Sequence, residues 1–207
     1  MEFQDVVRHR RMIRKYDLDR PVPKEIVDRM LQNAVRAPSA GFSQGWGFLV
    51  LDTQDGIARF REACLLDDEP DNYLAATVEA PVVIVTHSNR SVYLERYARA
   101  DKARDPAKAD EFWPAPYWDI DTGMAALLIL QTAVDAGLGA CFFGVPLQRF
   151  SQYRKAFGVP EEFKPIGAVS IGYPANEPKR DLRSRRKPAD EVIHFGRWGT
   201  TMSPSAG

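Results

Sequence analysis

The 207-residue sequence has little of what marks a disulfide-bonded or metal-binding protein. Its two cysteines, Cys64 and Cys141, are far apart and form no CxxC motif, so we expect neither a disulfide framework nor a zinc site. The three histidines, His9, His87 and His194, do not have the spacing of metal ligands. The sequence therefore predicts no metal site.

Long apolar runs and an excess of one charge are also missing. The longest apolar run, from Gly123 to Leu130, is far shorter than the roughly 20 residues that cross a bilayer. The first residues lack the apolar core of a secretory signal. Lys and Arg total 28 and Asp and Glu total 28, which argues against a general nucleic-acid-binding protein. We expect a cytoplasmic protein that binds neither membrane nor nucleic acid.

Familiar catalytic and nucleotide-binding motifs are absent as well. The sequence contains no Walker A motif and no GxSxG nucleophile elbow. The segment GLGACFFG contains glycines, but it follows a predicted helix and precedes a predicted strand, the reverse of a dinucleotide-binding fingerprint. Any phosphate group would therefore be held by side chains rather than by a glycine-rich loop.

What the sequence does contain is two clusters of basic residues near opposite ends. The first lies in RHRRMIRKY and the second in KRDLRSRRKP. The arginine side chain donates two parallel hydrogen bonds and suits phosphate, although charged runs are usually solvated. Arg10 and Arg14 lie four residues apart, and on a shared helix face such like charges would repel unless an anion lay between them. If the fold brings the clusters together, they could form one phosphate pocket.

Hydrophobic periodicity predicts a mixed α/β domain without internal repeats. Helices are expected over about residues 2–11, 23–37, 54–64, 119–136 and 147–157, and strands over 46–51, 81–87, 140–143 and 166–173, with a weak strand over 191–195. The helix over 119–136 is apolar almost all round, which is typical of a helix in the core or in a subunit interface. Its Asp119 and Asp121 are expected to be helix N-terminal residues.

Two segments between these elements have open interpretations. Residues 88–117 lose periodicity and include Phe112, Trp113, Tyr117 and Trp118, which could cover an active site or form a satellite core cluster. The loop PSAGFSQGW could be a simple turn, or its polar side chains (Ser39, Ser43, Gln44) could bond a flat heterocycle.

Taken in order, these segments resemble the nitroreductase family of flavin enzymes. RHRRMIRKY is similar to the family's RRSxRxF/Y pattern, with Met12 in place of the common Ser. APSAGFSQGW is similar to PSxxNxQPW, with Phe42 in place of Asn and Gly45 in place of Pro. A buried central helix, GACFFG and RSRRKP follow, so the resemblance spans nearly the whole chain.

The resemblance implies a fold as well as an activity. The fold would be α+β, a nitroreductase-like three-layer α-β-α sandwich with a mainly antiparallel central sheet. Residues 1–207 would form a single domain, with about 88–117 as an insertion covering the active site. About 176–207 would be a C-terminal arm exchanged between the subunits of a homodimer, and the helix over 119–136 would be part of the dimer interface.

The resemblance also implies where FMN would bind. Arg10 and Arg186 would hold its phosphate, Arg14 would approach the pyrimidine edge of the ring, and a backbone N–H near Gly144 would point towards flavin N5. Ser39, Ala40 and Phe42 would come from the other subunit. The full set of implied cofactor-binding residues is Arg10, Arg11, Met12, Arg14, Pro38, Ser39, Ala40, Phe42, Gln44, Asn72, Phe143, Gly144, Val145, Arg185 and Arg186.

The implied reaction is hydride transfer from NAD(P)H through flavin N5 to a flat acceptor, such as a nitroaromatic or a quinone, by a ping-pong mechanism. The flavin would carry the chemistry, tuned by Arg14 and Gly144, with no catalytic protein nucleophile. Phe112, Trp113 and Tyr117 are the candidate acceptor contacts. Alternatives are a flavin-destroying enzyme of the 5,6-dimethylbenzimidazole synthase type, a deazaflavin-using relative, or a non-catalytic flavin storage or sensor protein.

Overall fold

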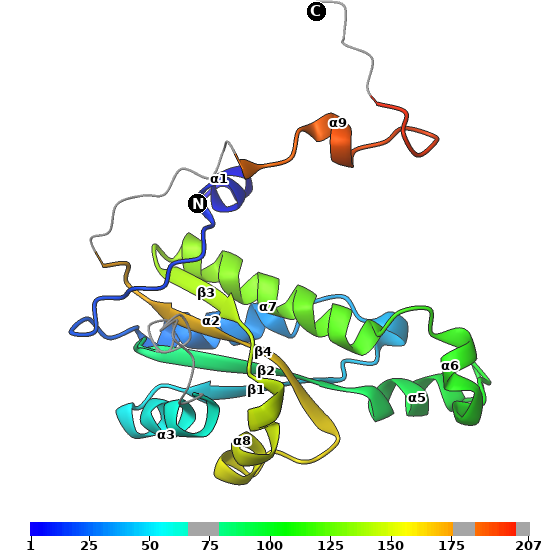
Figure 1. Ribbon diagram of the computed structural model, residues 1–207, viewed down its shortest axis with the longest axis horizontal. Helices are drawn as coiled ribbons and strands as arrows, with labels where there is room; N and C mark the ends of the chain where they lie inside the picture. The colour runs from blue at the N-terminus through cyan, green and yellow to red at the C-terminus, as the bar shows by residue number, and fades with distance from the viewer. Residues whose placement is uncertain (66–78, 176–184, 202–207) are drawn as a thin grey trace, which may run out of the picture. The chain divides into compact units, whose positions relative to one another are not determined.

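One antiparallel sheet organises the part of the chain that the computed structural model describes, residues 1–65, 79–175 and 185–201 (Figure 1). Its strands lie in the order β1-β2-β4-β3 and all neighbouring pairs are antiparallel. The strands are β1 (Trp46–Leu51), β2 (Val82–Asn89), β3 (Gly139–Phe143) and β4 (Phe163–Gly172). The predicted α+β class with an antiparallel sheet is confirmed.

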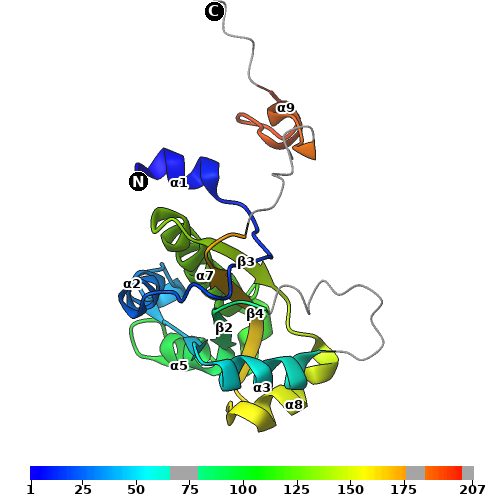
Figure 2. The same cartoon turned by 90° about the vertical axis from the view of Figure 1, so that its left-hand side faces the viewer.

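The first face of the sheet is covered by α2 (Lys24–Ala34) and α7 (Tyr117–Asp135). Val82 and Ile84 of β2 point to this face and pack in one buried cluster with Met30 of α2. The β-branched run of β2 suits a strand buried on both faces, and the apolar stripe of α2 suits a helix that covers one. Figure 2 shows both helices on the same side of the sheet.

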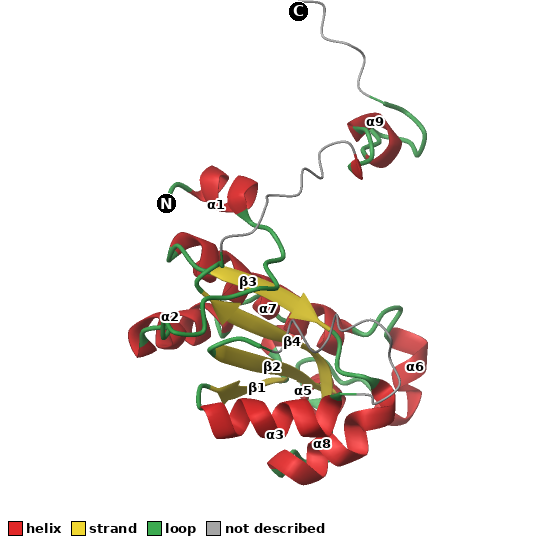
Figure 3. Cartoon of the chain, turned by 60° about the vertical axis from the view of Figure 1, so that its left-hand side comes forward, coloured by secondary structure: helices red, strands yellow, loops and turns green. Residues whose placement is uncertain are grey.

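The opposite face is covered by α3 (Gln54–Cys64) and α8 (Phe150–Phe157), which lie side by side in Figure 3. Val83 and Val85, which alternate with the residues facing α7, pack here with the fully buried Phe60 of α3. Helix α3 begins at Thr53, whose side chain accepts a hydrogen bond from the backbone of Gly56. The two helical layers and the sheet between them make the expected three-layer sandwich.

The N-terminal segment reaches the free edge of β3 after the short helix α1 (Phe3–His9). Met12 forms a parallel bridge with Ala140, and the backbone N–H of Ile13 donates to the carbonyl of Ala140 at 3.0 Å. The hydroxyl of Tyr16 lies 2.8 Å from Oγ of Ser170, within hydrogen-bonding distance. These bonds tie the segment that carries the first basic cluster to the edge of the sheet.

The segment over 88–117 contains regular structure that the sequence did not predict. It holds α5 (Arg90–Ala98), a 3-10 turn η2 (Pro106–Lys108) and α6 (Ala109–Phe112). Asn89 caps α5 by accepting a hydrogen bond from the backbone of Ser91 at 3.0 Å. The helix has no aliphatic stripe because its packed face consists of large tyrosines, so periodicity missed it.

The C-terminal residues from Asn176 form a second unit, which is described by itself. It contains α9 (Ala189–Val192), so the weak strand expected over 191–195 is wrong. Pro188 precedes this helix, and Asp190 and Glu191 occupy its first turn, where acidic residues favour a helix. In the described residues, no helix is sufficiently long and apolar to pass through a bilayer.

A buried histidine lies between β2 and α8. Nε2 of His87 is 2.8 Å from the hydroxyl of Tyr153, and its Nδ1 is 3.3 Å from the carbonyl oxygen of Gly47. A carbonyl only accepts, so Nδ1 carries the proton and Nε2 accepts from Tyr153. Burial lowers the pKa of this imidazole, and the charge of Arg154 adds to the effect.

This lowered pKa predicts a loss of stability in mild acid. The unfolded chain takes up a proton near the ordinary histidine pKa of about 6.5, before folded His87 does. The contribution is therefore complete above about pH 6.5 and is lost as the pH falls towards the folded pKa, with a slope of at most ~1.4 kcal/mol per pH unit. Chemical unfolding at several pH values should show a weaker pH dependence for His87→Gln. The exposed His9 provides the control, and equal pH dependence in wild type, His87→Gln and His9→Gln would contradict the assignment.

Candidate functional site

The end of β3 and the N-terminal segment form the first part of the candidate site. The backbone N–H of Phe142 points to the sulfur of Met12 at 3.4 Å, and Nη1 of Arg14 lies 3.4 Å from the carbonyl oxygen of Met12. Because the bridge to Ala140 is parallel, the chain after Met12 and the chain after Ala140 run in the same direction. The structure thus brings the first basic cluster alongside β3.

The residues at the end of β3 and directly after it differ in exposure. The side chain of Phe143 is buried, with its ring edge-on to that of Phe60 at 6.3 Å, so only its backbone can face a ligand. Gly144 is exposed, and a Cβ placed on it would meet no atom within 4 Å. Val145 is half-buried and packs against the α3–α8 cluster. The chain therefore offers open, unobstructed backbone at Gly144.

The loop between α2 and β1 forms the second part of the site, and its backbone is strained. It contains the 3-10 turn η1 (Ala40–Phe42). Gly41, Phe42 and Gln44 have φ values of 62°, 54° and 55°, in the left-handed region. That region costs a residue with a side chain free energy, and such residues cluster at functional sites where the surroundings hold them in place.

The serines of this loop are engaged by its own backbone. Oγ of Ser39 accepts from the N–H of Gln44 at 3.1 Å, and Oγ of Ser43 donates to the carbonyl of Ala40 at 2.6 Å. The predicted bonding of a heterocycle by Ser39, Ser43 and Gln44 remains a prediction, while the structure shows Ser39 and Ser43 stabilising the turn. The side chain of Phe42 is 76% exposed and points away from the core.

The buried carboxylate of Asp121 anchors the loop to α7, a role that the sequence did not predict. Oδ2 of Asp121 accepts from the N–H of Ala40 and from the hydroxyl of Tyr93, both at 2.8 Å. Burial and the carboxylate of Asp121 raise the pKa of Tyr93, so its hydroxyl stays protonated and donates. An acidic residue within the most apolar helix was the available signal, but a position near the helix start explained it equally well.

The aromatic residues of 88–117 pack around Trp113. The centre of its ring lies 4.6 Å from the ring centre of Tyr97, 5.6 Å from that of Tyr117, 6.0 Å from that of Trp118 and 6.1 Å from that of Tyr93. This is the satellite cluster that the sequence left as one alternative. The guanidinium of Arg104 lies 5.0 Å from the ring of the half-buried Phe112. Contact of Phe112, Trp113 and Tyr117 with an acceptor stays a prediction.

The comparison with protein families decides the identity of this arrangement. The sequence model of the nitroreductase family matches residues 7–173, from the first basic cluster to the end of β4. This chain belongs to the nitroreductase family. It is therefore an oxidoreductase, as the resemblance of its motifs implied.

Two sequence relatives of this nitroreductase-family protein and one similar structure carry names that fit this family. A protein of Methanothermobacter thermautotrophicus, whose name pairs NADH dehydrogenase with NAD(P)H nitroreductase, is 31% identical over 201 residues, covering 96% of this chain and 88% of its own. The NADH dehydrogenase of Thermus thermophilus is 29% identical, with 89% and 91% covered. A structure from Exiguobacterium sibiricum, described as a nitroreductase in complex with FMN, superposes with a TM-score of 0.70 at 22% identity, with 94% and 97% covered.

For some predicted site residues of the nitroreductase-family protein the predicted contact with FMN stays a prediction. Asn72 lies outside the described residues. Arg185 and Arg186 are exposed in the second unit, so the joint phosphate pocket with Arg10 stays a prediction. Pro38 and Arg11 are exposed at the surface of the first unit. In the described ranges, no group of three or more His, Cys, Asp or Glu could hold a metal ion.

Proposed function

We propose that this protein is an FMN-dependent oxidoreductase that passes hydride from NAD(P)H to a flat acceptor, such as a nitroaromatic or a quinone. The observation that carries the proposal is the exposed backbone at Gly144, with open space where a side chain would be, beside the arginine-bearing segment on β3. A planar cofactor needs such backbone access, and its phosphate needs guanidinium groups nearby. The residues present therefore fit FMN. The FMN-bound relative from Exiguobacterium sibiricum supports the choice.

Bound FMN would supply hydride-transfer chemistry at its N5. The chain's own residues would bind and orient its ring. The N–H groups near Gly144 would donate hydrogen bonds, and the positive charge of Arg14 would favour negative charge on the flavin. Arg10, with Arg185 and Arg186 of the C-terminal arm, would hold the phosphate. No protein nucleophile is required.

We propose that the functional unit is a homodimer in which α7 lies at the interface. Ile120 and Leu127 of this helix are each 44% exposed, although most of its other apolar residues are buried. They lie seven residues apart and so on one side of the helix, a position suited to a second subunit. In this arrangement the exposed Phe42 and the residues Ser39 and Ala40 would reach the cofactor of the other subunit, with the C-terminal arm exchanged.

The test is a near-ultraviolet and visible absorbance spectrum of the purified protein. We expect flavin bands that bleach when NADPH or NADH is added without oxygen and return when a quinone or nitroaromatic is added. Arg10→Ala and Arg186→Ala should lose flavin on gel filtration, because each removes a charge-assisted phosphate contact. A protein that stays colourless with added FMN would refute the proposal.

The same experiment separates the alternatives. Loss of the flavin chromophore after one turnover would indicate a flavin-destroying enzyme. Binding of a deazaflavin but not of FMN would indicate a deazaflavin-using relative. Tight FMN binding that never bleaches with either nicotinamide would indicate a storage or sensor protein.

A further inference from the structure

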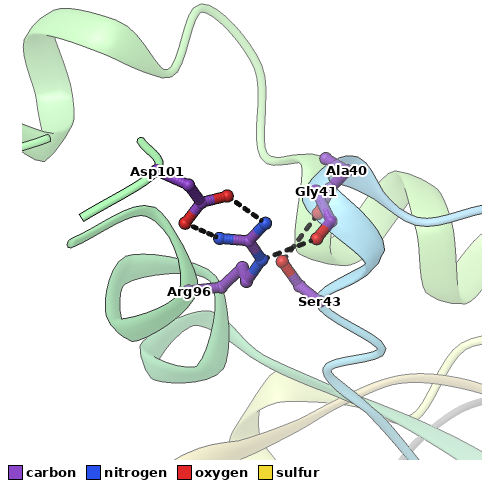
Figure 4. Close-up of polar contacts among 5 residues, drawn as sticks. All are labelled: Ala40, Gly41, Ser43, Arg96 and Asp101. Carbon is purple, nitrogen blue, oxygen red and sulfur yellow. Dashed lines mark hydrogen bonds and ion pairs between the residues drawn. The ribbon is translucent and has the colours of Figure 1, made fainter. Parts of the chain in front are cut away.

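The strained loop between α2 and β1 is held from outside by one arginine of α5. Nη1 and Nη2 of Arg96 donate to the two carboxylate oxygens of Asp101 at 2.8 and 2.7 Å, and its Nε donates to the carbonyl of Gly41 at 2.9 Å (Figure 4). The guanidinium thus lies between a turn at the end of α5 and the loop. Three of its donors therefore have acceptors, a forked arrangement that the guanidinium of arginine provides.

Arg96 bonds the loop within its stretch of left-handed backbone. The carbonyl that it binds belongs to Gly41, which precedes the left-handed Phe42. The ring of Tyr97, the next residue of α5, lies against Gly41, and a Cβ there would be 2.7 Å from its Cε2. On the other side Asp121 holds the N–H of Ala40. The strained turn therefore persists because groups from α7 and α5 hold its first two residues, Ala40 by its N–H and Gly41 by its carbonyl.

We propose that Arg96 is a positioning residue for the flavin reaction, which holds the 39–44 loop in the shape that Ala40 and Phe42 need to contact the flavin ring. The inference rests on the proposed function, because only that assigns the loop to the cofactor. It extends that function to the 90–101 segment, which the resemblance treats as a cover. In this role Arg96 acts through the backbone of Gly41 and requires no contact of its own with the cofactor or the acceptor.

The role of Asp101 is to aim the guanidinium. Its carboxylate is exposed to solvent, so the Coulomb attraction between the two charges is screened and contributes little to stability. The bidentate geometry instead fixes the plane of the guanidinium so that Nε points to Gly41. A lysine at this position would keep the charge but could not make both contacts.

The first measurement is amide hydrogen exchange of the loop in the flavin-free protein. In Arg96→Met and in Asp101→Asn we expect faster exchange at the amides of Phe42, Ser43 and Gln44, which are hydrogen bonded within the loop. The matched control is Arg61→Met on α3, because Arg61 also pairs with an acid, Glu79 at 2.9 Å, far from the loop. Asp101→Asn alters only an exposed side chain and keeps the test valid if Arg96→Met fails to fold.

The second measurement is FMN affinity and steady-state kinetics of the same variants. We expect about a tenfold weaker FMN affinity for Arg96→Met, a smaller loss for Asp101→Asn, no rescue in Arg96→Lys, and a wild-type value for Arg61→Met. The KM for the acceptor should change more than kcat, and the thermal unfolding of the flavin-free variants should match that of Arg61→Met. A purely structural role would instead lower the unfolding temperature of Arg96→Met below that of Arg61→Met and would leave the KM for the acceptor unchanged.

The two measurements separate the possible failures. Unchanged amide exchange of the loop in both Arg96→Met and Asp101→Asn would refute the idea that the Arg96–Gly41 contact restrains the loop. Faster exchange with unaltered FMN affinity and KM would refute the positioning role while leaving the proposed function intact. A wild-type protein that binds no FMN would overturn the proposed function and this inference with it, even if exchange responds as expected.

Discussion

Replacing Gly144 by valine should abolish tight flavin binding without weakening the fold. A Cβ at this position meets no protein atom within 4 Å, and the backbone φ is one that residues with side chains adopt. The valine would therefore fill space that the proposal assigns to FMN. Forcing extra methyl groups into an occupied site costs about 1–3 kcal/mol, so the FMN dissociation constant should rise about 5- to 150-fold.

Fluorescence titration of the flavin-free protein with FMN measures this change, and thermal unfolding of the same sample provides the control. Gly144→Ala should show a smaller loss, because it adds one carbon and leaves part of the space open. An unchanged unfolding temperature with lost FMN binding would locate the ring beside β3. Full FMN affinity in Gly144→Val would move the flavin away from this backbone and weaken the proposed function.

Replacing Asp121 by leucine should cause the largest loss of stability among the site variants. The change removes the shared acceptor of two donors, the part-buried N–H of Ala40 and the buried hydroxyl of Tyr93. Each stranded donor costs about 1–3 kcal/mol, so the free energy of unfolding should fall by several kcal/mol. Urea unfolding measures the loss, and FMN affinity should fall as well, because the loop that carries Phe42 is no longer anchored to α7.

The matching variants separate the lost acceptor from the lost charge. Both bonds end on Oδ2 of Asp121, so Asp121→Asn can keep both by placing its oxygen there, and its loss should be much smaller. Tyr93→Phe removes one donor instead of the acceptor and should cost about 1 kcal/mol. Equal losses for leucine and asparagine would mean that the negative charge, and not the acceptor, holds the loop.

The elements of the sandwich were predictable because their signals are local. The strand over 46–51 and the helix over 54–64 match β1 and α3, since the apolar pattern, turn residues and the cap at Thr53 all lie within or beside them. Helix α5 was missed because its packed face depends on Trp113, which comes later in the chain. The tail strand was wrong because only about five residues carried its signal.

The site was predictable only where residue type alone suggests chemistry. The arginines could be singled out from residue type, whereas Met12 and Gly144 were implied only by the family resemblance; Met12 does lie beside β3 and Gly144 directly after it. The roles of Asp121 and Arg96 could not, because each depends on a backbone group of the 40–41 turn that is far away in sequence. Long-range bonds to main-chain atoms leave no pattern in one sequence.

The bridge between Met12 and Ala140 also bears on solubility. An edge strand presents unpaired N–H and C=O groups to which another chain can add, which is a common route to aggregation. Where Ile13 donates to Ala140, part of that edge of β3 is already occupied by the chain itself. The segment that we assign to phosphate binding thus also covers part of an edge strand against pairing with a strand of another molecule.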